Sequence, residues 1–489
     1  MGFLRNSRNS PAGNDASAAA RRPRAWRRAG WAVAAAMLFG AGVGLGAWIR
    51  PRLEDPHTVA AERKSLVIAR AEVRQGEAGP VARIEVEIAG GTGVEAPQVD
   101  DMTLLRVAIE NVNPVADHVR GLFSEPLGWR LDRMKEVAVL PGPASPRQVL
   151  EDPTVQIGQT YAYQVRYRTS VLREERSPIA AVRVHDPETW WPTARVAAEI
   201  EKLLAAHPEA LRVETIGRGA HKGLPIIALR AGSRAEGAKT LVLVGAIHAG
   251  ESGPELILPA LAGVLARARE AAPLAAALER TAIFAVPVLN VDERDRLLSG
   301  HPTYLRKSPQ GIDLNRNFPA GWEEISRSYG TSSAEPDSWT YRGALPLSAV
   351  EASALHGALS KVQVAALLSY HWIYALTGTQ LEQPAGVTKA PEDLVRRQTE
   401  LASAWFAGLS RRPYPVAVKH PILDTSPGGS LVSWIFRERG APAFEVESAG
   451  DPRMEALRQA PPDRALLEEY QARHVDALEA VLLWLAGGS

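Results

Sequence analysis

The stretch Thr240-Leu-Val-Leu-Val-Gly-Ala-Ile-His-Ala-Gly-Glu251 decides the fold of this chain. Its first eight residues are mostly apolar, which is typical of a strand buried on both faces of a sheet. An imidazole, His248, and a carboxylate, Glu251, then stand three residues apart where the strand meets a turn. A second histidine, His371, ends a similar apolar run that begins at Val364.

Two nitrogens and one oxygen from two neighbouring strand ends can bind zinc and leave one coordination position for water. Such an open site is typical of catalytic rather than structural zinc. The His-x-x-Glu spacing alone is also compatible with surface or capping residues. Because the chain has no cysteine, a zinc ion must be held by histidine and carboxylate.

Composition and charge limit the function classes. The chain has 489 residues, enough for two domains, and 56 basic against 55 acidic residues give a formal net charge of +1. This balance offers no electrostatic case for nucleic-acid binding, so we expect no nucleic-acid partner. The oligomeric state does not follow from the sequence.

The first fifty residues predict a membrane anchor. Residues 1–28 are rich in arginine, and Ala29 to Ile49 then runs 21 residues without a charge. An uncharged helix of that length spans a bilayer at about 1.5 Å per residue. We therefore expect a basic cytoplasmic tail (1–28), an uncleaved transmembrane signal-anchor (29–49) and an exported catalytic domain, periplasmic or extracellular. The alternative is a cleaved signal peptide and a secreted protein.

Residues 58–185 predict a small all-β sandwich, because apolar and polar residues alternate between glycine, proline and asparagine turns. Tyr161, Tyr163, Val165 and Tyr167 are expected to share one strand face. Residues 150–184 resemble the corresponding part of a fibronectin type III-like sandwich. We interpret this domain as a spacer or docking module without chemistry of its own.

Residues 190–489 predict an α/β domain, because strand and helix patterns alternate. We expect a mixed, largely parallel sheet flanked by helices. Strands are expected at 225–230, 239–247 and 281–288, and helices at 194–207, 255–269 and 466–485. Functional sites of such sheets form at the carboxyl ends of the strands, where His248 and His371 are both expected.

Three further segments complete the pattern. They are Tyr304-Leu-Arg306, Gly311-Ile-Asp-Leu-Asn-Arg-Asn-Phe-Pro319 and Gly428-Gly-Ser…Trp434…Glu445-Val-Glu447. With them, the chain from about Thr193 to its end resembles the zinc carboxypeptidases of the carboxypeptidase A type. The short interval between Arg306 and Asn315 is most similar to the bacterial murein-peptide amidase branch.

The resemblance implies one zinc ion per chain, bound by His248, Glu251 and His371. It also implies that Glu447 is the general base that takes a proton from the zinc-activated water and delivers one to the leaving amine. Strand alternation places Glu445 on the same face as Glu447, so geometry alone leaves Glu445 as a competitor. The family motif favours Glu447.

The same resemblance assigns the substrate-contacting residues. Arg306 is expected to polarise the scissile carbonyl and stabilise the oxyanion. Asn315 and Arg316 are expected to bind the terminal carboxylate of the substrate, and a guanidinium suits that task because it binds carboxylates in bidentate fashion. Asp313 is expected to accept a hydrogen bond from the first zinc histidine and so to determine its tautomer.

The chain also departs from the family pattern. Digestive members have a tyrosine four residues before Gly-Gly-Ser, where this chain has Asp424. Tyr374 and Tyr414 are candidates to replace it. After Gly-Gly-Ser, Leu431 and Val432 provide no acid, which favours a neutral or apolar leaving residue.

The sequence therefore predicts a zinc-dependent exopeptidase that cleaves an amide bond next to a free carboxylate. The substrate is expected to be a protein C-terminus or a cell-wall peptide. Two alternatives remain. One is a zinc deacylase of small N-acyl amino acids, a related group that also has Asp-Leu-Asn-Arg followed by Phe-Pro. The other is an inactive, peptidase-like binding protein.

Overall fold

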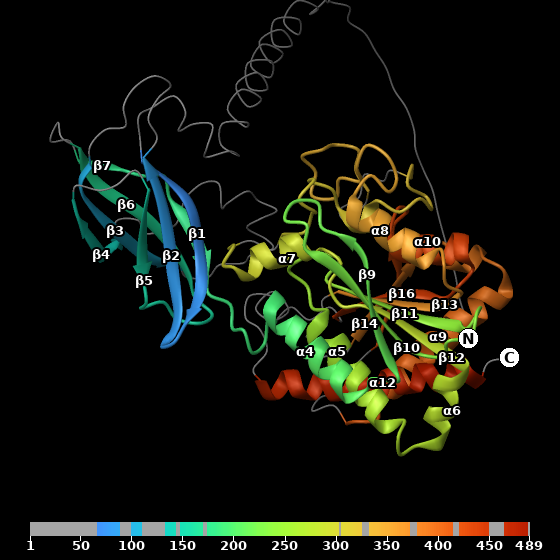
Figure 1. Ribbon diagram of the computed structural model, residues 1–489. Coiled ribbons are helices and arrows are strands. Elements are labelled where there is room, and N and C mark those ends of the chain that lie inside the picture. The colour runs from blue at the N-terminus through green and yellow to red at the C-terminus, as the bar shows by residue number, and fades with distance from the viewer. Residues whose placement is uncertain are drawn as a thin grey trace, which may run out of the picture. The chain divides into compact units, whose positions relative to one another are not determined.

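The computed structural model (Figure 1) divides the chain into two compact units, residues 1–62 and 63–489. The residues that it describes all belong to the second unit. They are residues 66–88, 99–109, 133–142, 147–169, 174–302, 305–324, 332–371, 379–413, 420–448 and 464–487.

The first described part of the chain is all β. Its strands are β1 (Leu66–Gly76), β2 (Gly79–Ile88), β3 (Val99–Ile109), β4 (Lys135–Pro141), β5 (Arg147–Asp152), β6 (Thr160–Thr169), β7 (Glu174–Arg176) and β8 (Ala180–Arg183). One sheet has the order β1-β2-β5, and the other has the order β4-β3-β6-β7 with β8 paired to β6. Apolar side chains from both sheets form one core. Tyr161, Tyr163 and Tyr167 are buried in it, as the alternation predicted. The resemblance to fibronectin type III is not confirmed.

A buried carboxylate, Asp152, connects strands of this region. It accepts hydrogen bonds from the Tyr163 hydroxyl (2.8 Å) and the Arg106 guanidinium (2.7 Å). Burial by itself raises the pKa of the Asp152 carboxyl, but hydrogen bonds from Thr154 and Tyr163 outweigh it and hold that pKa below its usual range. Since the folded-state pKa is depressed, this stabilisation is present above the unfolded pKa and is lost as the pH falls.

Replacing this carboxylate is expected to destabilise the all-β region. Asp152→Ala leaves the buried Tyr163 hydroxyl without its acceptor and removes the ion pair with Arg106, which should cost about 3 kcal/mol of unfolding free energy. Chemical denaturation followed by tyrosine fluorescence measures this loss. The neighbouring Glu151 is exposed, so Glu151→Ala is the matched control and should cost less than about 0.5 kcal/mol. Equal effects of the two variants would contradict the role of Asp152.

The second described part contains one eight-stranded sheet in the order β15-β14-β16-β13-β11-β12-β10-β9. Its strands are β9 (Leu211–Arg218), β10 (Pro225–Gly232), β11 (Lys239–Gly245), β12 (Thr281–Val286), β13 (Val364–Tyr370), β14 (Thr379–Pro384), β15 (Ile422–Ser426) and β16 (Ala443–Ser448). The central strands β12, β11, β13 and β16 are parallel to their neighbours in this group. β10 and β14 join this group antiparallel. The mixed, largely parallel sheet is thus as predicted.

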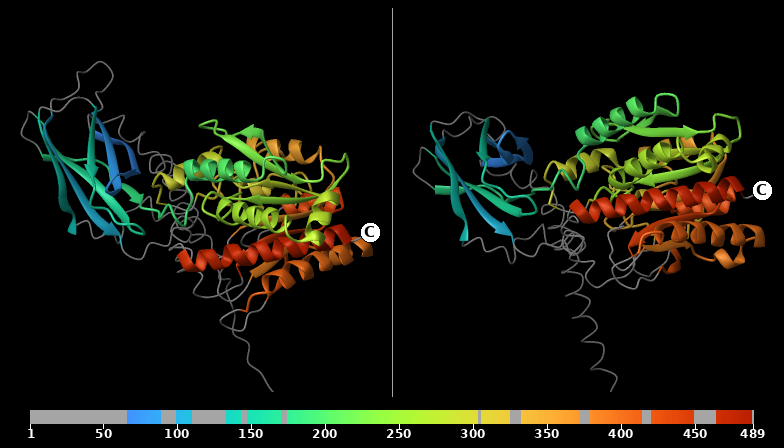
Figure 2. Two further views of the ribbon diagram at one scale, coloured as in Figure 1. Left: turned by 60° about the horizontal axis from the view of Figure 1, so that its bottom comes forward. Right: turned by 90° about the horizontal axis from the view of Figure 1, so that it is seen from below.

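Helices cover both faces of this sheet (Figures 1 and 2). They are α4 (Thr193–Ala206), α5 (Pro254–Arg267), α6 (Ala272–Arg280), α7 (Val291–Leu298), α8 (Val350–Leu359), α9 (Glu392–Leu409), α10 (Leu431–Arg439) and α12 (Arg464–Gly487). Apolar residues of α4, α5, α6, α9 and α12 form one core with the sheet. Those of α8 and α10 form a second core on the other face. β11 contributes to both, which explains its nearly unbroken apolar sequence.

One part of the predicted fold class is wrong. Within the described residues, no helix combines the length and the apolar character needed to cross a membrane. This finding contradicts the predicted transmembrane helix and the membrane-anchored localisation built on it, and we withdraw both. Residues 1–28 and 29–49, on which they depended, lie outside the described residues.

Candidate active site

The sheet topology brings the predicted metal ligands together. His248 and Glu251 lie in the turn that follows β11, and His371 follows β13 directly. β11 pairs with β13 in parallel, with Gly245 opposite Tyr370. The carboxyl ends of both strands therefore meet at one edge of the sheet, as expected for a functional site.

The three ligand side chains converge on one point and are almost completely buried. Their ligand atoms all lie within 4.8 Å of one another. The Glu251 carboxylate approaches His248 Nδ1 with one oxygen (2.9 Å) and His371 Nδ1 with the other (2.9 Å). Two imidazole nitrogens and a carboxylate are a zinc ligand set, and the residues present therefore fit this ion.

The other nitrogen of each imidazole has a partner that orients the ring. His248 Nε2 lies 3.1 Å from Asp313 Oδ1, and His371 Nε2 lies 3.3 Å from Ser369 Oγ. Partners of this kind determine which nitrogen carries the proton and leave Nδ1 for the metal. The predicted contact between Asp313 and the first histidine is thus present.

Asp313 also organises the segment that follows it. It is the N-cap of the 3₁₀ helix η2 (Leu314–Arg316), where its Oδ1 accepts a hydrogen bond from the Asn315 backbone amide (3.0 Å). Its Oδ2 accepts one from Arg306 Nε (2.8 Å). Burial alone would raise the pKa of the Asp313 carboxyl, but the charges of Arg306 and Arg316 outweigh this effect and hold it well below its usual range. Asp313 is therefore ionised.

Asn315 and Arg316 are buried beside this acid. The Asn315 side chain donates to Glu445 Oε1 (3.0 Å) and accepts from the Leu431 backbone amide (3.0 Å). The Arg316 guanidinium donates to the Asn315 carbonyl (2.7 Å). The Asn315 side chain is thereby held by β16 and α10, and the Arg316 guanidinium by the backbone of η2.

The two competing carboxylates have different surroundings. Glu445 accepts hydrogen bonds from Asn315 and from Ser426 Oγ (2.7 Å), so its oxygen holds the side chain of Asn315 in place. Glu447 instead lies 3.8 Å from His371 Nδ1, beside the metal ligands. Burial raises the pKa of the Glu447 carboxyl well above its usual range, although the charge of His371 opposes this shift. The surroundings of the two acids therefore differ, whereas strand alternation alone placed both on one face.

Arg294, in α7, is a positioning residue that the sequence analysis missed. Its Nη1 donates to the backbone carbonyls of Ala249 (3.0 Å) and Glu251 (2.6 Å), and its Nη2 bonds to the Glu255 carboxylate. Its side chain is only 2% exposed. One guanidinium therefore holds the turn that carries two metal ligands. No motif signals this role, because Arg294 lies in an ordinary charged stretch, Asp-Glu-Arg-Asp-Arg.

Close backbone packing also shapes this turn. A side chain at Gly253 would lie 2.4 Å from the Pro287 carbonyl, and one at Gly245 would lie 2.5 Å from Gly253 Cα. Ala246 has a positive φ of 45°, which is costly for a residue other than glycine. The turn after β11 is therefore tightly held before any ligand binds.

The structure shows where some of the residues that depart from the family pattern lie. Asp424 accepts a hydrogen bond from the Gly386 backbone amide (3.2 Å), so it supports a turn. Tyr374 and Tyr414 lie outside the described residues. Leu431 and Val432 are fully buried in the core beneath α10, which removes the reason for inferring substrate preference from them.

Comparisons with known proteins agree with this architecture. The sequence profile of the zinc carboxypeptidase family matches residues 196–471, which is more than half of the chain. Comparison with the sequences of curated proteins found no match. Among solved structures, thrombin-activatable fibrinolysis inhibitor is similar, with 17% identity, a TM-score of 0.51 and coverage of 62% of this chain and 76% of that one.

Two other solved structures are similar to this chain at lower TM-scores. Carboxypeptidase A from Helicoverpa armigera has 16% identity and a TM-score of 0.48, and covers 63% of this chain and 76% of its own. Murein-tripeptide amidase from Escherichia coli O157 has 21% identity and a TM-score of 0.31, and the match covers 55% of this chain and 95% of the amidase.

The fold and the buried His-Glu-His cluster define a zinc-dependent hydrolase. The chain belongs to the zinc carboxypeptidase family, whose members use zinc and act on peptides with a free C-terminus.

Proposed function

We propose that this protein is a zinc-dependent exopeptidase that removes a residue from the free C-terminal end of a peptide. The peptide is a protein C-terminus or a cell-wall peptide. The observation that carries the proposal is the position of Asn315 and Arg316. Asp313 connects this pair to the metal ligand His248, so a substrate carboxylate bound there lies beside the metal site.

Bound at His248, Glu251 and His371, zinc would supply Lewis acidity that lowers the pKa of a water molecule and polarises a carbonyl. Glu447 takes the proton of the attacking water and delivers a proton to the departing amine. Burial raises the pKa of the Glu447 carboxyl, which makes its carboxylate a stronger base toward the attacking water.

Arg306 stabilises the negative charge that develops on the scissile carbonyl oxygen. Its Nε is bound to Asp313 (2.8 Å), which orients the guanidinium, and its guanidinium carbon lies 5.5 Å from the centre of the Trp339 ring. A preorganised cation in a site that excludes water acts strongly on the transition state, because little reorganisation is needed.

The role of Arg316 predicts a dependence on the substrate terminus. For peptides with a free carboxylate, Arg316→Met should lower kcat/KM by about 10- to 100-fold, since a charge-assisted bond contributes about 1.5–3 kcal/mol. The same peptides with amidated ends should be poor substrates of both enzymes. Chromatography of the released residue measures these rates.

The matched control is Arg218→Met, because Arg218 is exposed and lies on the edge strand β9. It should leave both rates unchanged. Equal cleavage of free and amidated ends by the unchanged protein would refute the carboxylate-binding role. Hydrolysis of N-acetylated amino acids, without action on longer peptides, would instead favour the deacylase alternative.

A further inference from the structure

Two acids near the proposed active site lie directly opposite each other in the eight-stranded sheet. Glu382 of β14 is the cross-strand partner of Glu445 of β16 in this antiparallel pair. The Cβ atoms of such partners are about 4.5–5.5 Å apart, and both side chains point to the same face of the sheet. Like charges in this position are destabilising. Arrangements that cost stability in this way are expected mainly at functional sites.

The carboxylate of Glu382 is held in place by neutral groups. Its Oε1 accepts a hydrogen bond from Gln380 Nε2 (2.7 Å), and its Oε2 accepts one from Thr425 Oγ1 (2.9 Å). Burial raises the pKa of the Glu382 carboxyl, and the charge of Glu445 adds to this shift. Among the described residues, neither acid forms an ion pair. The neutral donors therefore orient the Glu382 carboxylate without providing a cation for it.

Glu445 lies against a residue that is proposed to bind the substrate terminus. Its Oε1 accepts hydrogen bonds from the Asn315 side chain (3.0 Å) and from Ser426 Oγ (2.7 Å). Within the part of the chain that the structure describes, its Oε2 has no hydrogen-bond partner. Glu445 is only 5% exposed, and a carboxylate oxygen without a donor is unfavourable in such surroundings. A donor from a bound ligand would remove this cost.

The charges around Arg316 favour a substrate that brings a cation. Burial lowers the pKa of the Arg316 guanidinium, and the negative charges of Asp313, Glu445 and Glu382 oppose this shift. Glu445 and Glu382 therefore lie within electrostatic reach of Arg316. Once Arg316 binds the terminal carboxylate of a substrate, its positive charge is neutralised and no longer compensates these acids. A positive charge on the same terminal residue would restore the balance of charges.

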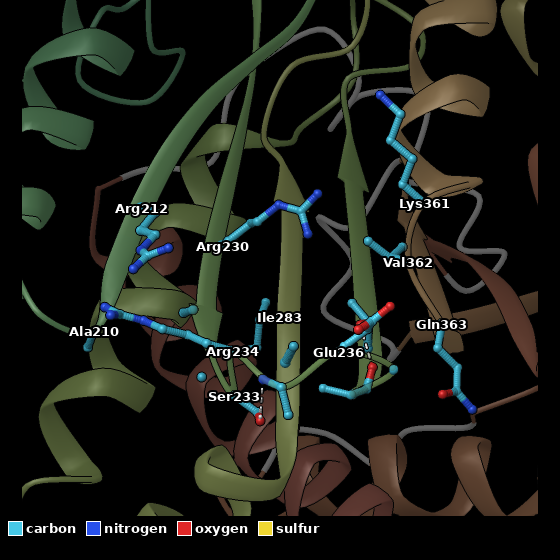
Figure 3. A pocket seen from close by; sticks show the side chains of 17 residues that line it. Ala210, Arg212, Arg230, Ser233, Arg234, Glu236, Ile283, Lys361, Val362 and Gln363 are labelled. Atoms are coloured by element: carbon cyan, nitrogen blue, oxygen red, sulfur yellow. Dashed lines mark hydrogen bonds between the residues drawn. The ribbon is translucent and has the colours of Figure 1, made fainter.

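Another like-charged pair in the same sheet is compensated by the fold itself. Arg212 of β9 and Arg230 of β10 are directly opposite each other, and both line the pocket shown in Figure 3. There Glu214 provides the opposite charge, because its Oε1 lies 3.0 Å from Arg230 Nε. The described residues offer Glu382 and Glu445 no bonded cation of this kind. The charge that compensates the acid pair is thus left to a ligand.

We propose that Glu382 and Glu445 select substrates whose terminal residue has a positively charged side chain, such as lysine. This inference rests on the proposed exopeptidase function and specifies the residue that is removed. Asn315 and Arg316 bind the terminal carboxylate, and the side-chain ammonium of the same residue binds the acid pair, with Glu382 as its principal ligand. The preference therefore comes from β14 and β16, and it needs no acid in the segment after Gly-Gly-Ser.

Two pairs of peptides that differ only in their last residue test this proposal with the full chain and zinc. One pair is an ordinary peptide that ends in lysine or in norleucine, which lacks the ammonium. The other pair is the cell-wall tripeptide Ala-γ-D-Glu-Lys and its norleucine form. The kcat/KM of a lysine peptide should exceed that of its norleucine partner by about 10- to 100-fold, mainly through a lower KM, because the ammonium contacts the acids before the transition state. The pair that is cleaved faster identifies the source of the substrate.

Glu382→Gln should reduce the ratio of lysine to norleucine cleavage at least about tenfold, because glutamine keeps the size of the side chain but loses its charge. Cleavage of the norleucine peptide by this variant shows that it is folded. Glu236→Gln is the matched control and should keep the ratio, since Glu236 is exposed beside the pocket of Figure 3.

The selectivity is refuted if the unchanged protein cleaves lysine and norleucine peptides equally, or if Glu382→Gln keeps the lysine preference. Either result leaves the exopeptidase function intact. If no peptide with a free carboxylate is cleaved, the exopeptidase function itself fails, and the selectivity with it.

Discussion

Glu447→Gln should reduce kcat by about 10²- to 10⁴-fold while zinc stays bound, because removal of a general acid-base group has effects of this size. Glutamine keeps the size of the side chain but cannot accept a proton from water. Glu447 lies in β16 at 3.8 Å from His371 Nδ1, so it is beside the metal ligands without being one of the buried cluster. Peptide hydrolysis under saturating substrate, with zinc content measured by atomic absorption, tests this expectation.

Glu445→Gln is the matched control, since both acids lie on the same face of one strand. Glutamine at 445 can still accept the hydrogen bonds from Asn315 and Ser426, so kcat should change by less than about tenfold. A normal kcat in Glu447→Gln together with an inactive Glu445→Gln would reverse the assignment of the base.

Arg294→Met should cost about 3–5 kcal/mol of unfolding free energy, because it leaves the buried carboxylate of Glu255 without its cation. It also releases the carbonyls of Ala249 and Glu251, so zinc affinity should fall about 10- to 100-fold, as for other residues that orient metal ligands. Denaturant unfolding and competition with a zinc chelator measure the two effects separately.

Arg296→Met provides the comparison within the same helix. Arg296 is 53% exposed, and among the described residues its ion-pair partner is Glu293, one helical turn away, so its loss should cost less than about 1 kcal/mol. Zinc affinity should be unchanged. If Arg294→Met bound zinc as tightly as Arg296→Met, the turn would not depend on this guanidinium and the positioning role would be wrong.

The parts of the fold that were predictable are those with strong local patterns. β11 and β13 have unbroken apolar runs because the sheet is covered by helices on both faces, and such runs are recognisable in the sequence. The cluster of His248, Glu251 and His371 was predictable too, because parallel neighbouring strands end at one edge. The preference for Glu447 over Glu445 as the base came from the family motif, because strand alternation places both acids on one face and their different partners appear only in the fold.

Other features depend on contacts between distant segments and have no local signal. Arg294 reaches the ligand turn from another helix, and its sequence neighbours are charged like any surface helix. The cross-strand pair of Arg212 and Arg230 follows from the register of β9 and β10, which alternation alone does not determine. The membrane prediction was made from a single uncharged run, residues 29–49, which lies outside the described residues. It is contradicted because no described helix has membrane-spanning character.

If the proposed function holds, Asp313 should link the binding of metal and the binding of substrate thermodynamically. Its two oxygens contact His248, Arg306 and the amide of Asn315, so the same carboxylate contacts a predicted metal ligand and two residues proposed to bind the substrate. A ligand that orders Arg306 and Asn315 should therefore increase the affinity for zinc. Zinc should increase the affinity for that ligand by the same factor. Without zinc, the protein should therefore bind peptide ends more weakly and lose its activity. With substrate bound, it should release zinc less readily.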